Sequence, residues 1–232
     1  MSISLCIPTH NRFDTFLKKN LEKFVQCKYI NEIIIVDDAT DDYDKLVSVY
    51  GLNHDKIKLY RQDVNVGVFK NKVKAASLAT CDWICLFDSD NYLDERYFEP
   101  LFLEWEKNGA DEKTIYTPSK ASPTYNIKNS NLLSRIITKQ IWNTLVPKPW
   151  YLNLGNFVFH KSLVPFLQIP EYHQHNCYAV DVVFINWIGL KHGFVIKFVD
   201  EMTYDHVVHK QSTYLLTSSE SSKFNSTFDW TL

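Results

Sequence analysis

The sequence predicts an α/β fold whose central sheet is mostly parallel and flanked by helices. The first observation is that apolar runs of strand length alternate with stretches of helical periodicity over about the first 105 residues. The second is that runs such as "EIIIVD" (32–37) and "WICLF" (83–87) are apolar throughout, as in strands buried between two layers of helices. Together these observations indicate a nucleotide-binding type of architecture.

The first two strand–helix units are the clearest. The β-branched run "ISLCI" (3–7) is a strand that Pro8 stops, and apolar residues then recur at helical spacing over 12–26. The second unit starts with the strand at 32–37. After a turn rich in aspartate, it continues into a short helix near 43–50.

Two more units follow. The alternating segment "KIKLY" (56–60) predicts a third strand, and "VFKNKVKAASLA" (68–79) predicts a helix that begins after Gly67. The fourth strand is the buried run at 83–87. Aromatic and aliphatic residues at helical spacing over 97–105 then predict a strongly amphipathic helix.

The second half of the chain is less regular, although it still alternates between strand and helix signals. Gly193 is placed to close the last helix. The strands that we expect cover 114–118, 156–160, 194–199 and 203–208, and the helices cover 131–143 and 181–193.

Composition and charge exclude several classes of protein. Lys plus Arg total 25 against 27 for Asp plus Glu, so no basic excess points to nucleic acid or to an anionic membrane surface. The five cysteines are odd in number and lie mostly in apolar runs, which favours reduced thiols in a cytosolic protein. We expect neither a signal peptide nor a membrane span, because no apolar run approaches about 20 residues.

Polar residues gather directly after the expected strands. They form "PTHNR" (8–12), "DDATDD" (37–42), "DVNVGVFKN" (63–71) and "DSDN" (88–91). Each cluster alone could be a turn or a helix cap. Ligands of open parallel sheets bind outside the carboxyl ends of the strands, so four clusters at the same edge predict a binding site. The helix that starts after Gly67 would favour an anion such as a diphosphate at its N-terminus.

Asp88 and Asp90 follow a buried strand with one residue between them, so their charges need a positive partner. Mg²⁺ and Mn²⁺ prefer oxygen ligands and often bind through one or two carboxylates together with substrate phosphates. We therefore expect Mn²⁺ or Mg²⁺, bound to a nucleotide diphosphate, as that partner. One aspartate would hold the metal while the other reaches the nucleotide ribose or a second oxygen.

The ordered set of these segments resembles the GT-A glycosyltransferases, and most closely their family 2. The resemblance covers most of residues 3–200. It implies the GT-A fold, with a smaller acceptor-side subregion beside the central sheet. The segments that carry it are "CIPTHNR" (6–12), "IIIVDDATDD" (33–42), "NVGVFKNKVKAAS" (65–77), "WICLFDSDN" (83–91) and "AVDVVFINWIGLKHGFVIKFV" (179–199).

The resemblance also implies a domain organisation. A single domain would cover 1–210, with a nucleotide-sugar-binding half at 1–108 and an acceptor-side half at 109–210. The polar segment 211–232 would be a loosely held tail.

Site residues follow from the same resemblance. Asp38 would bind the base, Lys70 would lie near the diphosphate, and Asp90 would be the direct metal ligand of the D-x-D motif. The implied nucleotide-sugar site consists of Pro8, Thr9, His10, Arg12, Asp38, Asn65, Gly67, Lys70, Asp88, Ser89, Asp90, Gly155 and Asn156.

Asp181 matches the position where inverting members keep their general base, at the start of the acceptor-side helix. Such an aspartate could also simply cap that helix, and the two roles are compatible. Asp88 and Asp90 are the implied metal ligands, and His206 and His209 are further candidates, although either histidine could equally be bonded locally at a strand edge.

The sequence departs from the family pattern at three positions. Val180 stands where an acidic residue often precedes the base, His10 replaces a more common tyrosine, and Lys70 replaces an arginine. A lysine lacks the bidentate fork with which arginine binds phosphate. These departures concern the donor assignment more than the fold.

Two further segments could take part. His173, His175 and Cys177 resemble metal ligands, but no fourth ligand is apparent, so we expect that loop to border the acceptor pocket. Trp150 and Tyr151 could stack on a sugar, or could simply pack.

The expected function is metal-dependent transfer of a sugar, with inversion, from a nucleotide-diphosphate donor to a hydroxyl of a saccharide or glycan. A UDP-sugar is the expected donor, and TDP- and GDP-sugars remain open. We expect a cytoplasmic enzyme that does not bind nucleic acid; contact with a membrane face and the oligomeric state are left open.

Three alternatives compete with this interpretation. A nucleotidyltransferase would usually show a glycine-rich loop after the first strand, and "PTHNR" has no glycine. A non-catalytic sugar-nucleotide-binding domain would share every donor residue. A receiver domain would begin with the strand that precedes its acidic pair, whereas here a complete strand–helix unit comes first.

Overall fold

The computed structural model confirms the α/β class, with one central sheet. The order of its strands is β3-β2-β1-β4-β8-β5-β9-β7, and β6 pairs with β5 outside this path. The residues that the structure describes are 1–41, 43–50, 54–130, 132, 134–145, 150–168, 180–210 and 212–232.

The first half of the sheet is parallel, as the apolar runs predicted. Its strands are β1 (Ile3–Thr9), β2 (Ile30–Asp37), β3 (Ile57–Arg61) and β4 (Trp83–Leu86). Strand β1 pairs in parallel with both β2 and β4, so the strand order reverses beside β1. In open α/β sheets this switch point is where ligands bind, beyond the carboxyl ends of the strands.

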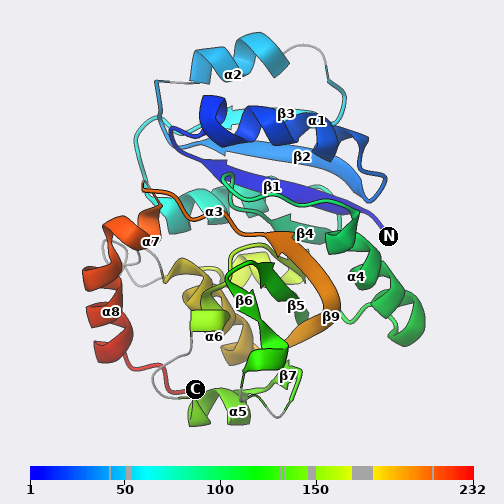
Figure 1. Cartoon of the computed structure of the whole chain (residues 1–232), viewed down its shortest axis with the longest axis vertical. Helices are drawn as coiled ribbons and strands as arrows, with labels where there is room; N and C mark the ends of the chain where they lie inside the picture. The colour runs from blue at the N-terminus through cyan, green and yellow to red at the C-terminus, as the bar shows by residue number, and fades with distance from the viewer. Residues whose placement is uncertain are drawn as a thin grey trace.

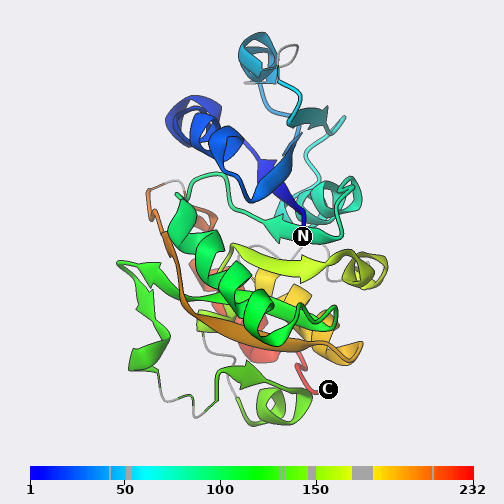
Figure 2. The ribbon, with the colours of Figure 1, turned by 90° about the vertical axis from the view of Figure 1, so that its right-hand side faces the viewer.

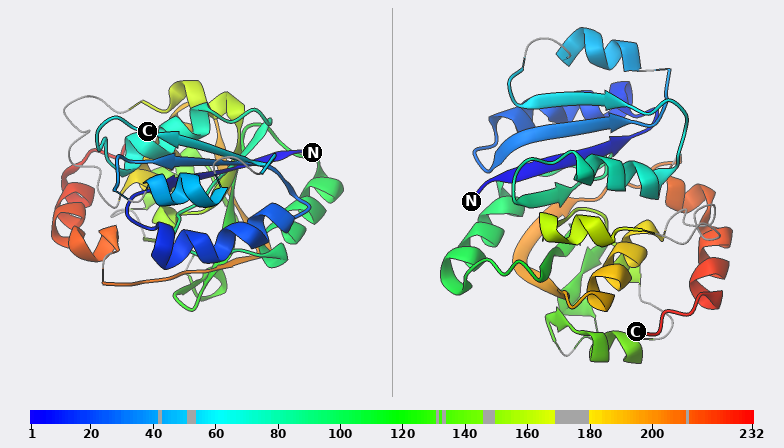
Figure 3. Two further views of the ribbon diagram at one scale, coloured as in Figure 1. Left: turned by 90° about the horizontal axis from the view of Figure 1, so that it is seen from above. Right: turned by 180° about the vertical axis from the view of Figure 1, so that it is seen from behind.

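Helices cover both faces of this half. The helix η1–α1 lies on one face and α3 on the other, as the views from the front and from behind show (Figures 1 and 3). The helices of this half are η1 (Phe13–Leu17), α1 (Lys18–Gln26), α2 (Tyr43–Tyr50), α3 (Val68–Ser77) and α4 (Glu95–Asn108). Each overlaps a helix expected from the sequence.

The second half of the sheet is mixed. Strand β8 (Phe157–His160) is antiparallel to both β4 and β5 (Thr114–Ser122), whereas β5 and β9 are parallel. Figure 2 shows α4 crossing the curved strand β9, against which it packs. The short strands β6 (Tyr125–Asn126) and β7 (Ile136–Ile137) complete this half. The mostly parallel sheet of the prediction therefore describes the first half only.

Two expected elements are corrected. The strands expected over 194–199 and 203–208 form one strand, β9 (Val195–Asp205). Glu201 adopts a positive φ of 62° within it, where the pairing with β5 shifts register, so the strand continues through a β-bulge. The helix expected over 131–143 is a short helix, α5 (Lys139–Thr144), preceded by β7.

The remaining helices belong to the second half of the chain. Helix α6 (Asp181–Lys191) packs on the same face as α3, where Phe184 contacts Phe69 with ring centroids 6.5 Å apart. Four short helices and one longer helix complete the described chain: η2 (Ile127–Asn129), η3 (Trp150–Asn153), η4 (Lys161–Phe166), α7 (Thr213–Leu216) and α8 (Ser218–Thr227). In the described part of the chain, no helix combines the length and apolar character needed to cross a bilayer.

The end of the chain packs against the domain, whereas the sequence favoured a loosely held tail. Trp230 is buried and its ring lies 5.0 Å from that of Phe184 in α6. The indole N–H of Trp142 donates to the carbonyl of Trp230 at 2.9 Å. Serine and threonine dominate the local composition and conceal the spaced aromatic residues that make these contacts.

Trp230 therefore stabilises the fold, and this is testable. Trp230→Ala should lower the free energy of unfolding by about 3–5 kcal/mol, the usual cost of removing a buried aromatic side chain. Chemical denaturation followed by far-UV circular dichroism measures this difference. Leu216→Ala is the matched control, because Leu216 is 68% exposed and such surface changes usually cost less than about 0.5 kcal/mol. Equal midpoints for Trp230→Ala and wild type would contradict the prediction.

Candidate active site

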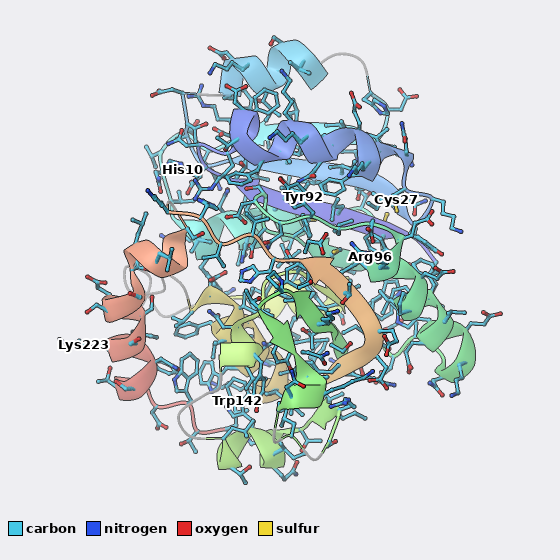
Figure 4. All side chains as sticks on the ribbon, viewed as in Figure 1. His10, Cys27, Tyr92, Arg96, Trp142 and Lys223 are labelled. Atoms are coloured by element: carbon cyan, nitrogen blue, oxygen red, sulfur yellow. The ribbon has the colours of Figure 1, made fainter. Side chains whose placement is uncertain are left out.

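Loops that follow β1, β2 and β4 meet at one rim of the sheet. Figure 4 shows His10 at this rim and Cys27 near the opposite edge of the same half. The amide of Asp38 donates to the carbonyl of Thr9 at 2.9 Å, and Nδ1 of His10 lies 3.0 Å from the carbonyl of Asp38. Pro8 and Thr9 are buried at the end of β1. The expected convergence of the first two polar clusters is present.

The carboxylate of Asp38 connects the loop after β2 with the loop before α3. It accepts the amides of Val66 at 2.8 Å and Gly67 at 3.0 Å, which fixes the loop that leads into α3. These two amides lie just before α3, and the expectation that the first turn of this helix attracts a diphosphate stays a prediction.

Asp37 has a different task. Its carboxylate accepts both the amide and the hydroxyl of Thr40, at 2.9 and 2.5 Å, in a buried turn. The carboxylate of Asp37 therefore holds the turn that follows β2. Ala39, between Asp38 and Thr40, adopts a positive φ of 56°, a conformation that non-glycine residues seldom take outside tightly determined loops.

The D-x-D loop after β4 is held by Asn91, which sequence reasoning did not select. The side-chain carbonyl of Asn91 accepts the amide of Val207 at 3.0 Å, and its backbone carbonyl accepts the side-chain amide of Asn20 at 3.0 Å. The loop is therefore attached both to α1 and to the segment after β9. Figure 4 shows Tyr92 and Arg96 beside β9, where Tyr92 exchanges two backbone hydrogen bonds with Asp205.

Asp90 lies within reach of two candidate partners. Its Oδ2 is 2.9 Å from Nε2 of His209 and 3.9 Å from Nε of Arg12. The ring of Phe16 packs against that of His209 with centroids 4.6 Å apart. The segment after β9 thus crosses the D-x-D loop and brings a histidine to the second aspartate.

The two histidine candidates differ in their contacts. His206 pairs with the hydroxyl of Thr124 through Nδ1 at 2.8 Å, whereas His209 lies against Asp90. Burial lowers the pKa of His206, and the charges of Asp88 and Asp90 oppose this effect.

The side chains at this rim can be compared with the ligands that a divalent metal ion prefers. Among the residues that the structure describes, no group of three or more His, Cys, Asp or Glu side chains is arranged to hold one. Asp90 and His209 offer one oxygen and one nitrogen, which fits a divalent cation that completes its shell with phosphate oxygens and water.

Lys72 is the positive partner of the first aspartate. Its ammonium lies 2.7 Å from Oδ1 of Asp88 and 2.6 Å from Oδ2 of Asp181, and its side chain is only 4% exposed. The ion triad Asp88–Lys72–Asp181 joins the D-x-D loop, α3 and the start of α6. From the sequence, the expected positive partner of Asp88 was a metal ion bound to a nucleotide diphosphate.

Burial and charge compete within the ion triad. Burial lowers the pKa of Lys72, but the charges of Asp181 and Asp88 outweigh burial and raise it, so the lysine is a cation. Burial raises the pKa of Asp181; Lys72 opposes this effect, and the charge of Asp88 adds to it. An aspartate with a raised pKa is a better proton acceptor than an exposed one.

Lys72 could have been found from helical spacing. Phe69, Lys72 and Ala76 recur at the i, i+3, i+7 positions of one face of α3, and all three are buried. A lysine on an apolar face needs a buried partner. The residue selected instead, Lys70, lies on the exposed face of the same helix.

Gly155 and Asn156 support the first aspartate. A Cβ at Gly155 would lie 1.9 Å from Oδ2 of Asp88, so glycine is required for close approach. The next residue, Asn156, adopts a positive φ of 70°. The side-chain carbonyl of Asn156 accepts the amide of Asp88 at 2.8 Å. Both residues therefore contact the D-x-D motif.

The other candidates divide into two groups. Ser89 is buried within the D-x-D loop, and exposed Asn65 accepts the amide of Gly67 at 3.0 Å. The ring of Tyr151 stacks on Tyr125 with centroids 5.9 Å apart, which indicates packing. His173, His175, Cys177 and the side chain of Trp150 lie outside the described residues.

The curated proteins that this chain resembles are glycosyltransferases. Abequosyltransferase RfbV of Salmonella typhimurium (strain LT2) is 36% identical over 98 residues, which are 40% of this chain and 29% of that protein. Glycosyltransferase GlyG of Streptococcus pneumoniae serotype 4 is 27% identical over 111 residues, 47% of this chain and 36% of that protein. The matches therefore span about a third of the length of these relatives.

Solved structures share the fold at low identity. Residues 1–349 of S. aureus TarS superpose with a TM-score of 0.65 at 13% identity, covering 99% of this chain and 67% of that one. The mannosyltransferase PcManGT of Pyrobaculum calidifontis, in complex with GDP-Man and Mn²⁺, gives a TM-score of 0.63 at 14% identity and covers 92% and 59% of the two chains.

The fold is therefore that of the GT-A glycosyltransferases, as the order of the polar segments led us to expect. Residues 4–165, well over half of the chain, match the family described as "Glycosyl transferase family 2". The chain belongs to glycosyl transferase family 2.

Proposed function

We propose that the protein transfers a sugar from a nucleotide diphosphate to a hydroxyl of a saccharide or glycan, with inversion at the anomeric carbon. The observation that carries the proposal is the ion triad, because it places Asp181 beside the D-x-D loop at the carboxyl ends of the strands. A donor bound at that loop would present its sugar to a buried carboxylate.

The nucleotide is proposed from neighbours with the same fold. S. aureus TarS has been solved with UDP and with UDP-GlcNAc, and PcManGT with GDP-Man and Mn²⁺. We propose a UDP-sugar, bound by the rim of Thr9, His10 and Asp38. A GDP-sugar is the alternative that these neighbours leave.

The chemistry requires a base and a stabilised leaving group. The acceptor oxygen forms a bond to the anomeric carbon, and its proton passes to the carboxylate of Asp181. The bond from that carbon to the phosphate oxygen breaks, and its electron pair leaves with the nucleoside diphosphate. Arg12, beside Asp90, and Lys70, on the exposed face of α3, are cations that can meet the charge of the leaving group.

A divalent cation fits this scheme. Asp90 and His209 would hold Mn²⁺ or Mg²⁺, and the ion would neutralise the charge that develops on the diphosphate. Asp88, paired with Lys72 and enclosed by Gly155, is then placed for the ribose or for a second oxygen of the donor.

Asp90→Ala tests the metal role. We expect UDP with Mn²⁺ to raise the melting temperature of the wild type, because a ligand that binds only the native state stabilises it. The variant should lose this manganese-dependent shift. Asp44→Ala, on exposed helix α2, is the control and should keep it. A full shift in Asp90→Ala would remove that residue from the metal site, and no shift with any sugar nucleotide in the wild type would overturn the proposed function.

Asp181→Asn separates binding from chemistry. The amide keeps the shape of the side chain but cannot take a proton, so turnover should fall by about 10²–10⁴-fold. The thermal shift with UDP and Mn²⁺ should persist. Turnover is measured as UDP released from UDP-sugars in the presence of a saccharide acceptor panel, or from transfer to water. Full turnover in this variant would exclude Asp181 as the base.

Gly155→Ala tests the enclosure of Asp88. The added methyl should displace the Asp88 carboxylate from Lys72 and cost about 1–3 kcal/mol of stability, the penalty for leaving one N–H of the buried ammonium without its acceptor. Asp88→Ala provides a matched background, because it removes the oxygen that the methyl would meet. The Gly155→Ala substitution should therefore shift the denaturation midpoint only when Asp88 is present. The same cost in both backgrounds would refute the explanation.

A further inference from the structure

The ion triad contains a residue to which neither the family resemblance nor the comparisons assigned a role. Lys72 lies one turn into α3, and its ammonium is in contact with two carboxylates from distant parts of the chain. Asp88 belongs to the donor side of the proposed reaction, and Asp181 would be its base. One cation therefore touches both halves of the site.

Lys72 is confined where it lies. Its side chain is 4% exposed and that of Asp181 is 8% exposed, so neither can turn into water without opening the packing between α3 and α6. A buried ammonium without a partner costs several kcal/mol. The lysine is thus held by its two carboxylates, and they are held by it.

Asp88 cannot follow a displaced lysine. Its amide is bonded to Asn156, and its Oδ2 faces the backbone of Gly155 with no room for even a methyl group between them. Asp88 therefore holds Lys72 at a fixed place beside the D-x-D loop. Asp181, at the first turn of α6, takes its orientation from that lysine.

We propose that Lys72 is a positioning residue. This inference rests on the glycosyl transfer proposed above. Lys72 holds the carboxylate of Asp181 at a fixed place relative to the D-x-D loop, so that the base faces the anomeric carbon of the bound donor. It also keeps together the carboxylates of Asp88 and Asp181, which would otherwise repel each other. If Lys72 only attached α3 to α6, its ion pair with Asp181 would be enough. The additional contact with Asp88 would then not be needed.

The test is a double-substitution cycle with Lys72→Met and Asp181→Asn. Methionine has nearly the length of lysine without its charge. In the wild-type background we expect Lys72→Met to lower kcat by about 100-fold, as misplaced catalytic groups do. The affinity for UDP with Mn²⁺, measured by calorimetry, should change by less than about fivefold, since the loss lies in the chemical step.

In the Asp181→Asn background, Lys72→Met should lower the residual kcat no further, because the group that it positions is already inactive. Residues that act independently would instead give losses that multiply. Lys74→Met, on the exposed face of the same helix, is the control and should leave kcat unchanged. Wild-type kcat in Lys72→Met, or equal losses in both backgrounds, would overturn the proposal.

Two features keep the test decisive. The same cycle with Lys72→Arg, which keeps the charge but lengthens the side chain, gives the answer if Lys72→Met does not fold, and the same pattern of losses is expected. Failure of the parent function is recognised separately. If Asp181→Asn itself keeps full turnover while UDP binds, the assignment of the base is wrong. If Asp181→Asn is inactive and Lys72→Met is not, only the role of Lys72 is wrong.

Discussion

The site depends on one buried ammonium placed between two carboxylates. Lys72 comes from α3, Asp88 from the loop after β4, and Asp181 from α6, so three elements share a single electrostatic contact. Removing the lysine would leave the two carboxylates facing each other without a counter-charge, and breaking a buried ion pair in this way costs far more than the pair itself contributes to stability. This arrangement is weak evidence for stability, but it fixes geometry well.

Around that contact, the rim is assembled mainly by the protein's own hydrogen bonds. Asp38 takes the amides that lead into α3, Asn91 ties the D-x-D loop to α1 and to Val207, and Asn156 supports Asp88. Short polar side chains thus bond to backbone in neighbouring loops and hold them in place. Such a site is rigid before any ligand arrives, which lowers the cost of binding.

The fold of the first half could be predicted because its signals are local: each strand is a short apolar run, and each helix shows its own periodicity. The convergence of polar loops followed from the parallel arrangement. The partners of Lys72 could not be found in this way, because they lie far away in sequence and no nearby residue indicates them. Strand β9 was predicted as two strands on either side of the exposed Asp200 and Glu201, whereas the chain stays extended through them with a positive φ at Glu201.

The path of the chain after β9 has a consequence for its engineering. This segment first crosses the D-x-D loop, where Val207 and His209 make their contacts, and then returns through Trp230 to brace the helix that carries Asp181. A version cut just after Asp205 would retain every strand of the sheet but lose helices α7 and α8. It would also lose the contacts that connect the D-x-D loop with α6, so shortening the protein for crystallisation should spare these final residues.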